Sequence, residues 1–221
     1  MPQLTQIKET KKGRLALFFD GEFAFSLDEE TFAKADLHEE DLLEDWQIED
    51  LRKQSDTRRA LDKAMDYLSL RDHAAGELYQ KLCRKFDEHS AAYAVARAGE
   101  LGLLNDADFA RRRAAELLRK RKSRREILLD LTAKGIDRDT AAEAVEALYA
   151  ETDDGEDPEL ATARALVERQ YAAKLAAGKR DQVAAALARR GFSHSIIRAA
   201  LADDPSILEH HSDVVKDGPE E

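Results

Sequence analysis

The sequence contains few of the residues that interrupt helices or cross-link chains. Its 221 residues include 10 Gly, 4 Pro and a single cysteine, Cys83. One thiol excludes an internal disulfide and a cysteine metal cluster, and it fits a reducing compartment. No apolar run approaches the roughly 18 residues that a membrane span needs, and the N-terminus has no signal-peptide core. We therefore expect a cytoplasmic protein.

Charged side chains are abundant and unevenly distributed. Residues that are hydrophobic make up 43% of the chain and charged ones 37%, well above the usual value of about 25%. The net charge is −11, but residues 1–57 hold 7 basic and 15 acidic side chains and residues 203–221 hold 1 and 7, whereas residues 58–202 hold 27 and 24. The acidity is therefore concentrated at the two ends, and the middle is close to neutral.

The first segment predicts a β-hairpin. Alternating apolar residues over 15–19 and 23–27 flank Asp20-Gly21, a pair that suits the two left-handed positions of a tight hairpin turn. Residues 3–10 could add a third strand. Residues 29–55 look helical and acidic, and an isolated hairpin needs such a partner to be stable.

Three later segments repeat one pattern, in which two apolar residues four apart precede a basic residue. They are Leu78-x3-Leu82-x2-Lys85, Ile127-x3-Leu131-x2-Lys134 and Val183-x3-Leu187-x2-Arg190. Each pattern predicts the second helix of a three-helix unit.

Local signals place the ends of these helices. Ser123 and Glu126 form a capping-box pattern at a helix start, and Gly135 and Gly191 suit the left-handed position after a helix end. We expect a hairpin with an acidic helical segment over 1–57 and three-helix repeats over 58–104 and 105–150. A linker with a third repeat would occupy 151–202 and an acidic disordered tail 203–221.

The most distinctive charged feature lies in the second repeat, where nine cations fall within fifteen residues. They are Arg111, Arg112, Arg113, Arg119, Lys120, Arg121, Lys122, Arg124 and Arg125, and Glu116 is the one acidic residue among them. At about 100° per residue, most of these cations fall on one side of a helix. Ala110, Ala114 and Leu117 fall on the other. Such a face could attract phosphates or an acidic protein surface, and the alternative is an ordinary solvated helix face.

Other candidate features have simpler structural explanations. Asp106 and Asp108 resemble a helix start more than a metal or acid–base pair, because no convergent partners are visible. The histidines show no ligand spacing, Cys83 lies in an apolar helical pattern, and no phosphate-binding loop or catalytic triad motif is present. We therefore expect no cofactor, no metal and no enzymatic activity.

Taken in order, several of these motifs resemble the RecX family of bacterial recombination regulators. The similar segments are Tyr67-Leu68-x2-Arg71, Glu77-Leu78-x3-Leu82, the stretch Leu101 to Ala110, and Ser123 to Ile136. They cover most of residues 58–200. Ala74 and Phe86 depart from the family pattern, which more often has Ser and Gly at these places.

The resemblance implies a mainly α fold of tandem three-helix repeats in an elongated curved array, after a small N-terminal β-hairpin. It also implies a partner, the RecA recombinase filament on single-stranded DNA, whose recombinase, ATPase and coprotease activities such regulators limit in DNA repair and the SOS response. Weak non-specific DNA binding by a monomer would fit this activity. The alternative is a direct DNA-binding regulator built of helix-turn-helix-like modules.

The basic residues of the second repeat are the candidate surface for binding partner or DNA. The surface comprises Arg111, Arg112, Arg113, Arg119, Lys120, Lys122, Arg124 and Arg125, with secondary basic turns at Lys134, Arg189 and Arg190.

Overall fold

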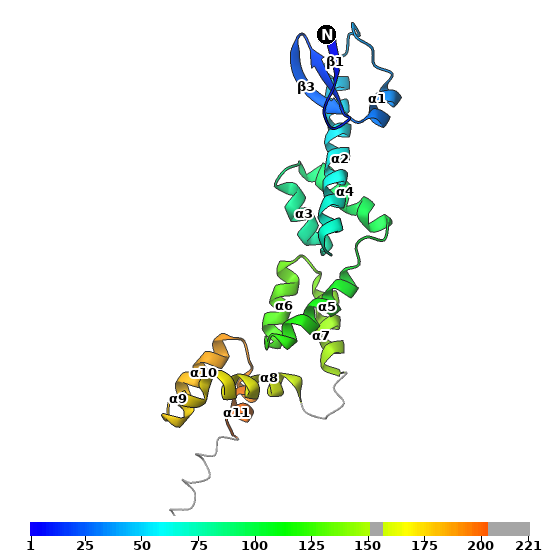
Figure 1. The fold of residues 1–221 in the computed structure, drawn as a ribbon. Helices are drawn as coiled ribbons and strands as arrows, with labels where there is room; N and C mark the ends of the chain where they lie inside the picture. The colour runs from blue at the N-terminus through cyan, green and yellow to red at the C-terminus, as the bar shows by residue number, and fades with distance from the viewer. Residues whose placement is uncertain (151–156, 203–221) are drawn as a thin grey trace, which may run out of the picture. The chain divides into compact units, whose positions relative to one another are not determined.

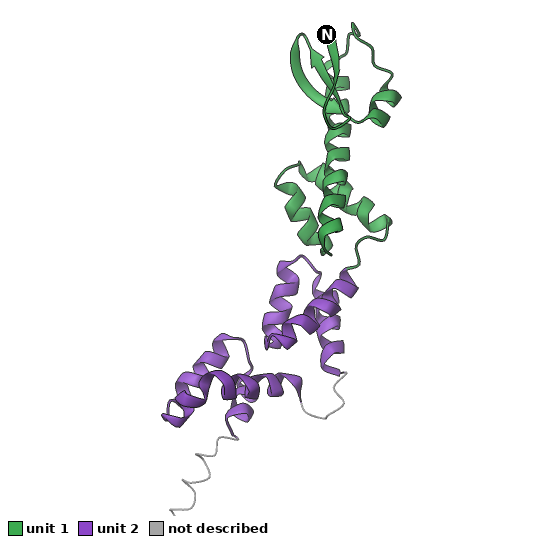
Figure 2. Cartoon of the chain, viewed as in Figure 1, with its two compact units in different colours: residues 1–105 green, residues 106–221 purple. Residues whose placement is uncertain are grey.

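The computed structural model describes residues 1–150 and 157–202. The chain forms two compact units, Met1–Asn105 and Asp106–Glu221 (Figure 2). Most described residues lie in helices, and a small antiparallel sheet precedes them (Figure 1). The mainly α fold with an N-terminal β segment is thereby confirmed, whereas the expected tail over 203–221 and most of the expected linker lie outside the described residues.

The N-terminal sheet contains the predicted hairpin and the third strand. Strands β1 (Leu4–Glu9), β2 (Leu15–Phe19) and β3 (Glu22–Leu27) pair antiparallel in that order. Asp20 and Gly21 have φ angles of 51° and 86°, as a tight turn between right-twisted strands requires. Alternate residues of the strands enter one core, where Leu4, Leu17 and Leu27 are fully buried.

The helical segment expected over 29–55 is interrupted, and the expectation is wrong for residues 36–44. Helix α1 (Glu29–Ala35) ends at Asp36, whose φ angle is 49°, and helix α2 (Asp45–Leu70) starts nine residues later. The break arises because Glu44 and Gln47 form a capping box at the start of α2. Leu43 and Leu51 then pack under the sheet.

The C-terminal half of α2 is the first helix of a three-helix group in the first unit. Helices α3 (Ala75–Cys83) and α4 (Glu88–Glu100) pack against it, and Ala60, Ala64, Leu78 and Leu82 form the buried centre. Small alanines on α2 and α4 let these two helices approach closely. Helix α2 runs without interruption through residue 57, where we expected the N-terminal segment to end and the first repeat to begin. That boundary stays a prediction.

The second unit contains two further groups of helices. Helices α5 (Asp106–Arg119), α6 (Arg124–Ala133) and α7 (Arg138–Ala150) form one. The other consists of α8 (Pro158–Leu166), the π-helix η1 (Val167–Tyr171), α9 (Ala172–Ala176), α10 (Arg180–Arg189) and α11 (His194–Ala202). None of the described helices is long and apolar enough to cross a membrane.

The repeated apolar positions have the same role in each group. All six of them are buried at 0% exposure: Leu78, Leu82, Ile127, Leu131, Val183 and Leu187. Gly135 and Gly191 have left-handed φ angles of 80° and 90° after α6 and α10. At the equivalent place after α3, the Phe86 amide donates to Leu82 in a continued helical bond, so this corner needs no left-handed residue and accepts Phe.

Candidate functional site

Helix α5 places the basic residues by burying its other side. Ala110 and Ala114 are fully buried and Leu117 nearly so. The predicted amphipathic helix is therefore present, and Arg111 and Arg112 on its outer side are 62% and 58% exposed.

Several acidic side chains lie among these cations. Asp108, one turn before, reaches Arg111 at 3.4 Å and Arg112 at 3.0 Å. These pairs are exposed, and exposed ion pairs contribute at most about 1 kcal/mol. A phosphate or a partner carboxylate could therefore replace Asp108 at little cost.

Arg113 makes a different kind of contact. Its Nε and Nη2 atoms both donate to the Asp130 carboxylate at 2.8 Å, and its Nη1 donates to Glu116 at 2.9 Å. The side chains of Arg113 and Asp130 are only 25% and 29% exposed. The paired hydrogen bonds between them lower the pKa of Asp130 and raise that of Arg113. Arg113 thus ties α5 to α6, and a docking role for it stays a prediction.

Three more of the predicted cations have acidic partners. Lys120 bonds Glu116 at 2.5 Å and Lys122 bonds Glu126 at 2.9 Å. Arg124 pairs with Glu146 of α7 and lies 5.4 Å from the centroid of the Tyr149 ring. Glu116, the one acidic residue within the stretch 111–125, is therefore only one of several counter-charges, because most of the neutralising carboxylates lie outside that stretch.

Among the nine cations of residues 111–125, those without an acidic partner lie in or beside the turn between α5 and α6. Within the described parts of the chain, Arg119, Arg121 and Arg125 have no acidic side chain at ion-pair distance. Arg121 was not among the candidate residues, although it lies at the centre of this turn. Its φ angle of 57° is left-handed, and its amide donates to Leu118 at 2.8 Å in the bond that closes α5.

This turn packs against the turn between α10 and α11. The Ser123 hydroxyl donates to the Arg190 carbonyl at 2.6 Å and accepts from the Glu126 amide at 3.2 Å, so the predicted capping box also joins the two helical groups. Gly191 touches Arg125 so closely that a Cβ there would lie 3.1 Å from two carbons of its side chain.

The end of α10 adds further cations to the same region. Arg189 is exposed and has no acidic partner within the residues that the structure describes, and Arg190 donates to Gln170 at 2.8 Å. Lys134, the other predicted basic turn, is the C-cap of α6, and its charge helps to lower the pKa of Asp130. We call Arg119, Arg121, Arg125 and Arg189 the basic corner.

The described residues contain no group of three or more His, Cys, Asp or Glu side chains placed to hold a metal ion. Asp106 is the first residue of α5, and Asp108 pairs with arginines as described. Cys83 is half-buried at the end of α3.

Comparison with known proteins gives consistent matches. Residues 60–97 match the model of the first three-helix domain of RecX, and residues 105–145 match that of the second. The chain is 27% identical to the regulatory protein RecX of Bacillus subtilis (strain 168), over 98% of this chain and 82% of that protein. The protein of the same name from Caldanaerobacter subterraneus is 28% identical over 65% of this chain and 73% of its own length.

Solved structures show the same fold. A crystal structure of regulatory protein RecX has a TM-score of 0.64 and 20% identity, covering 92% of this chain and 100% of that one. The crystal structure of RecX from Lactobacillus salivarius has a TM-score of 0.56 and 24% identity, covering 67% and 96%. With both three-helix models matched in order, the chain belongs to the RecX family of regulatory proteins.

Proposed function

We propose that this protein regulates homologous recombination by docking on the RecA filament that forms on single-stranded DNA. Docking would limit the ATPase, recombinase and coprotease activities of the filament, and so restrain DNA repair and the SOS response. The proposal places the protein in the cytoplasm as a monomer that acts by binding and needs no cofactor or catalytic step. Its membership of a family of regulatory proteins supports this role.

The basic corner is the observation on which the proposal rests. Arg119, Arg121 and Arg125, in or beside the α5–α6 turn, and Arg189 at the end of α10 present positive charge without intramolecular ion pairs in the described structure. A nucleoprotein filament exposes phosphates and carboxylates, which pair with arginine in charge-assisted hydrogen bonds. Arg111 and Arg112, whose exposed bonds to Asp108 are easily exchanged, would extend this surface along α5.

The proposal is tested on preformed RecA–single-stranded DNA filaments by following ATP hydrolysis. The wild-type chain should inhibit at or below one molecule per RecA protomer. The triple variant Arg119→Gln, Arg125→Gln, Arg189→Gln should keep its helical circular dichroism, because exposed substitutions cost little stability, yet should inhibit roughly tenfold less. The control changes Lys8, Lys11 and Lys12 of the exposed β1–β2 region to Gln, which removes the same charge elsewhere.

Equal inhibition by the basic-corner variant and the wild type would reject the basic corner as the docking surface. Absence of inhibition by the wild type would reject the function itself. The direct DNA-binding alternative predicts tight, sequence-dependent binding to duplexes without RecA. Fluorescence anisotropy should instead give weak binding of equal affinity for all duplexes, which falls steeply with salt.

A further inference from the structure

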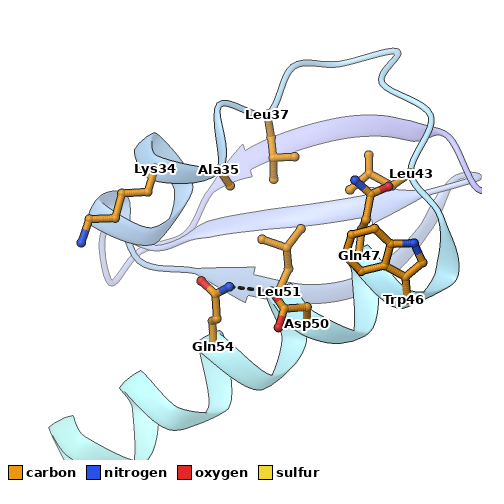
Figure 3. Close-up of a pocket in the computed structure, with 9 residues that line it drawn as sticks. All are labelled: Lys34, Ala35, Leu37, Leu43, Trp46, Gln47, Asp50, Leu51 and Gln54. Atoms are coloured by element: carbon orange, nitrogen blue, oxygen red, sulfur yellow. Dashed lines mark hydrogen bonds between the residues drawn. The ribbon is translucent and has the colours of Figure 1, made fainter.

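The first unit has a groove, lined by both apolar and polar side chains, that the proposed function does not use. It lies between α1 and α2, where Leu37, Leu43 and Leu51 form its floor, and it encloses about 350 Å³ (Figure 3). Trp46, in the first turn of α2, stands at its edge and is 69% exposed. Such a volume accommodates one or two apolar side chains.

Trp46 is costly to leave in water. A tryptophan gains most from burial, and it is enriched among the residues that dominate binding energy at protein interfaces. Leu42, four residues earlier, is also 58% exposed. The cation–π contacts of the described residues involve other rings, and in this part of the chain no Lys or Arg lies over the Trp46 ring. The ring is therefore available to a cation from outside.

Most charged side chains near the groove are acidic. Residues 36–50, which supply part of its lining, contain eight acidic side chains and no Lys or Arg. Asp50 lines the groove and accepts one hydrogen bond from Gln54 at 2.8 Å. Asp45 and Glu49 are exposed beside it on α2, and Glu49 pairs with Lys53 at 3.8 Å. Lys34, the cation at the rim, is bonded to Glu30 at 2.7 Å. This field repels nucleic acid and attracts a cationic partner.

We propose that this groove binds a Lys- and Arg-rich amphipathic helix of a partner protein. The helix would place one apolar side chain against Leu37, Leu43 and Leu51 and stack a basic side chain on Trp46. Its other basic side chains would pair with Asp50 in the lining and with Asp45 and Glu49 beside the groove. This is the helix-in-groove mode, in which an apolar face gives affinity and surrounding charges give orientation. The surface and its partner are independent of the basic corner and of filament docking.

The probe is a fluorescein-labelled helical peptide of Lys and Leu with one apolar face, added to the full chain. Its controls are a scrambled peptide of equal composition and a Glu/Leu peptide. Trp46 is the only tryptophan in the sequence, so its emission should shift to the blue when the amphipathic peptide binds. The scrambled peptide should bind roughly tenfold more weakly, and the Glu/Leu peptide should not bind.

Two groove variants locate the binding. Trp46→Ala should weaken binding roughly tenfold or more, as truncation of a central interface aromatic does, and Tyr93→Ala, an exposed aromatic on α4, is its control. The variant Asp45→Asn, Glu49→Gln, Asp50→Asn should weaken binding to a similar degree. Its control is Glu143→Gln, Glu168→Gln, Asp181→Asn, which removes three exposed acids elsewhere.

Several outcomes would overturn the proposal. Equal binding of the scrambled peptide, or equal affinity of groove and control variants, would mean that bulk charge alone attracts the probe. An unchanged Trp46 emission would place binding elsewhere. If sedimentation shows self-association of the wild type that Trp46→Ala abolishes, the occupant is a second copy of the chain and the proposal is wrong. If single-stranded DNA displaces the peptide and Trp46→Ala does not weaken peptide binding, the peptide does not bind in the groove.

Discussion

Replacing Arg113 with Ala should destabilise the second unit far more than replacing its neighbour Arg112. Arg113 makes three hydrogen bonds to carboxylates, two of them to Asp130 on the next helix. Such charged bonds contribute about 1.5–3 kcal/mol each when fully buried. Because the Arg113 and Asp130 side chains remain 25% and 29% exposed, we expect a total loss of about 2 kcal/mol.

The measurement is thermal and urea unfolding followed by circular dichroism. For a protein of this size a loss of about 2 kcal/mol lowers Tm by about 4–8 °C. Arg112 is 58% exposed and its pair with Asp108 is a surface one, so Arg112→Ala should cost about 0.5 kcal/mol or less. A double-mutant cycle between Arg113 and Asp130 should give a coupling free energy of about 1 kcal/mol or more.

Equal, small losses for the two single variants would refute this reasoning. A double-mutant cycle with a coupling free energy near zero would also refute it. The hydrogen bonds between Arg113 and Asp130 would then add no stability beyond that of hydrogen bonds from each side chain to water. If Arg113→Ala kept full stability but lost inhibition of the filament, Arg113 would belong to the docking surface rather than to the α5–α6 contact.

Three further predictions concern the same unit. Ser123→Ala should lower the free energy of unfolding by about 1–2 kcal/mol in urea titrations, because Ser123 caps α6 and its buried hydroxyl also donates to the Arg190 carbonyl; a loss below the error of the titration would contradict this. Arg121→Gly should raise Tm, since relief of a left-handed residue is worth about 1 kcal/mol, while it weakens docking; a lower Tm would show that the Arg121 side chain is stabilising. The Asp130 pKa is lowered by Arg113, so the pair's stability is present above the ordinary pKa of 3.8 and is lost as the pH falls through the lower folded value; Asp130→Asn should flatten the acid limb of stability against pH, and an unchanged limb would argue against the pair.

Features that depend on neighbouring residues in the sequence were predicted well. Asp20-Gly21 indicated the hairpin and Ser123 with Glu126 the capping box, because turn geometry and helix caps are local. The repeated apolar spacing identified buried positions for the same reason: it reflects the period of one helix.

Features that depend on contacts between helices were not predicted. The run 111–125 contains one acid, but Asp130 and Glu146 neutralise Arg113 and Arg124 from α6 and α7, and no periodicity reveals such pairs. The contact of Ser123 with Arg190, 67 residues away, is equally invisible in the sequence. Only the structure therefore separates the free cations from the paired ones.

Some local details were missed because their signals are uncommon. The break before α2 comes from Glu44 with Gln47, whereas capping boxes usually begin with Ser or Thr. Arg121 occupies a left-handed position that glycine usually takes. The available signal for this turn was the cation Lys122 followed by Ser123, a residue that can cap the start of the next helix.

The central claim is that the basic corner of the second unit docks on the RecA–single-stranded DNA filament. The most direct test is an electron cryo-microscopy structure of the full chain bound to that filament. Our account predicts that Arg119, Arg121, Arg125 and Arg189 lie within hydrogen-bond distance of filament carboxylates or DNA phosphates. A bound chain whose basic corner faces solvent would contradict it.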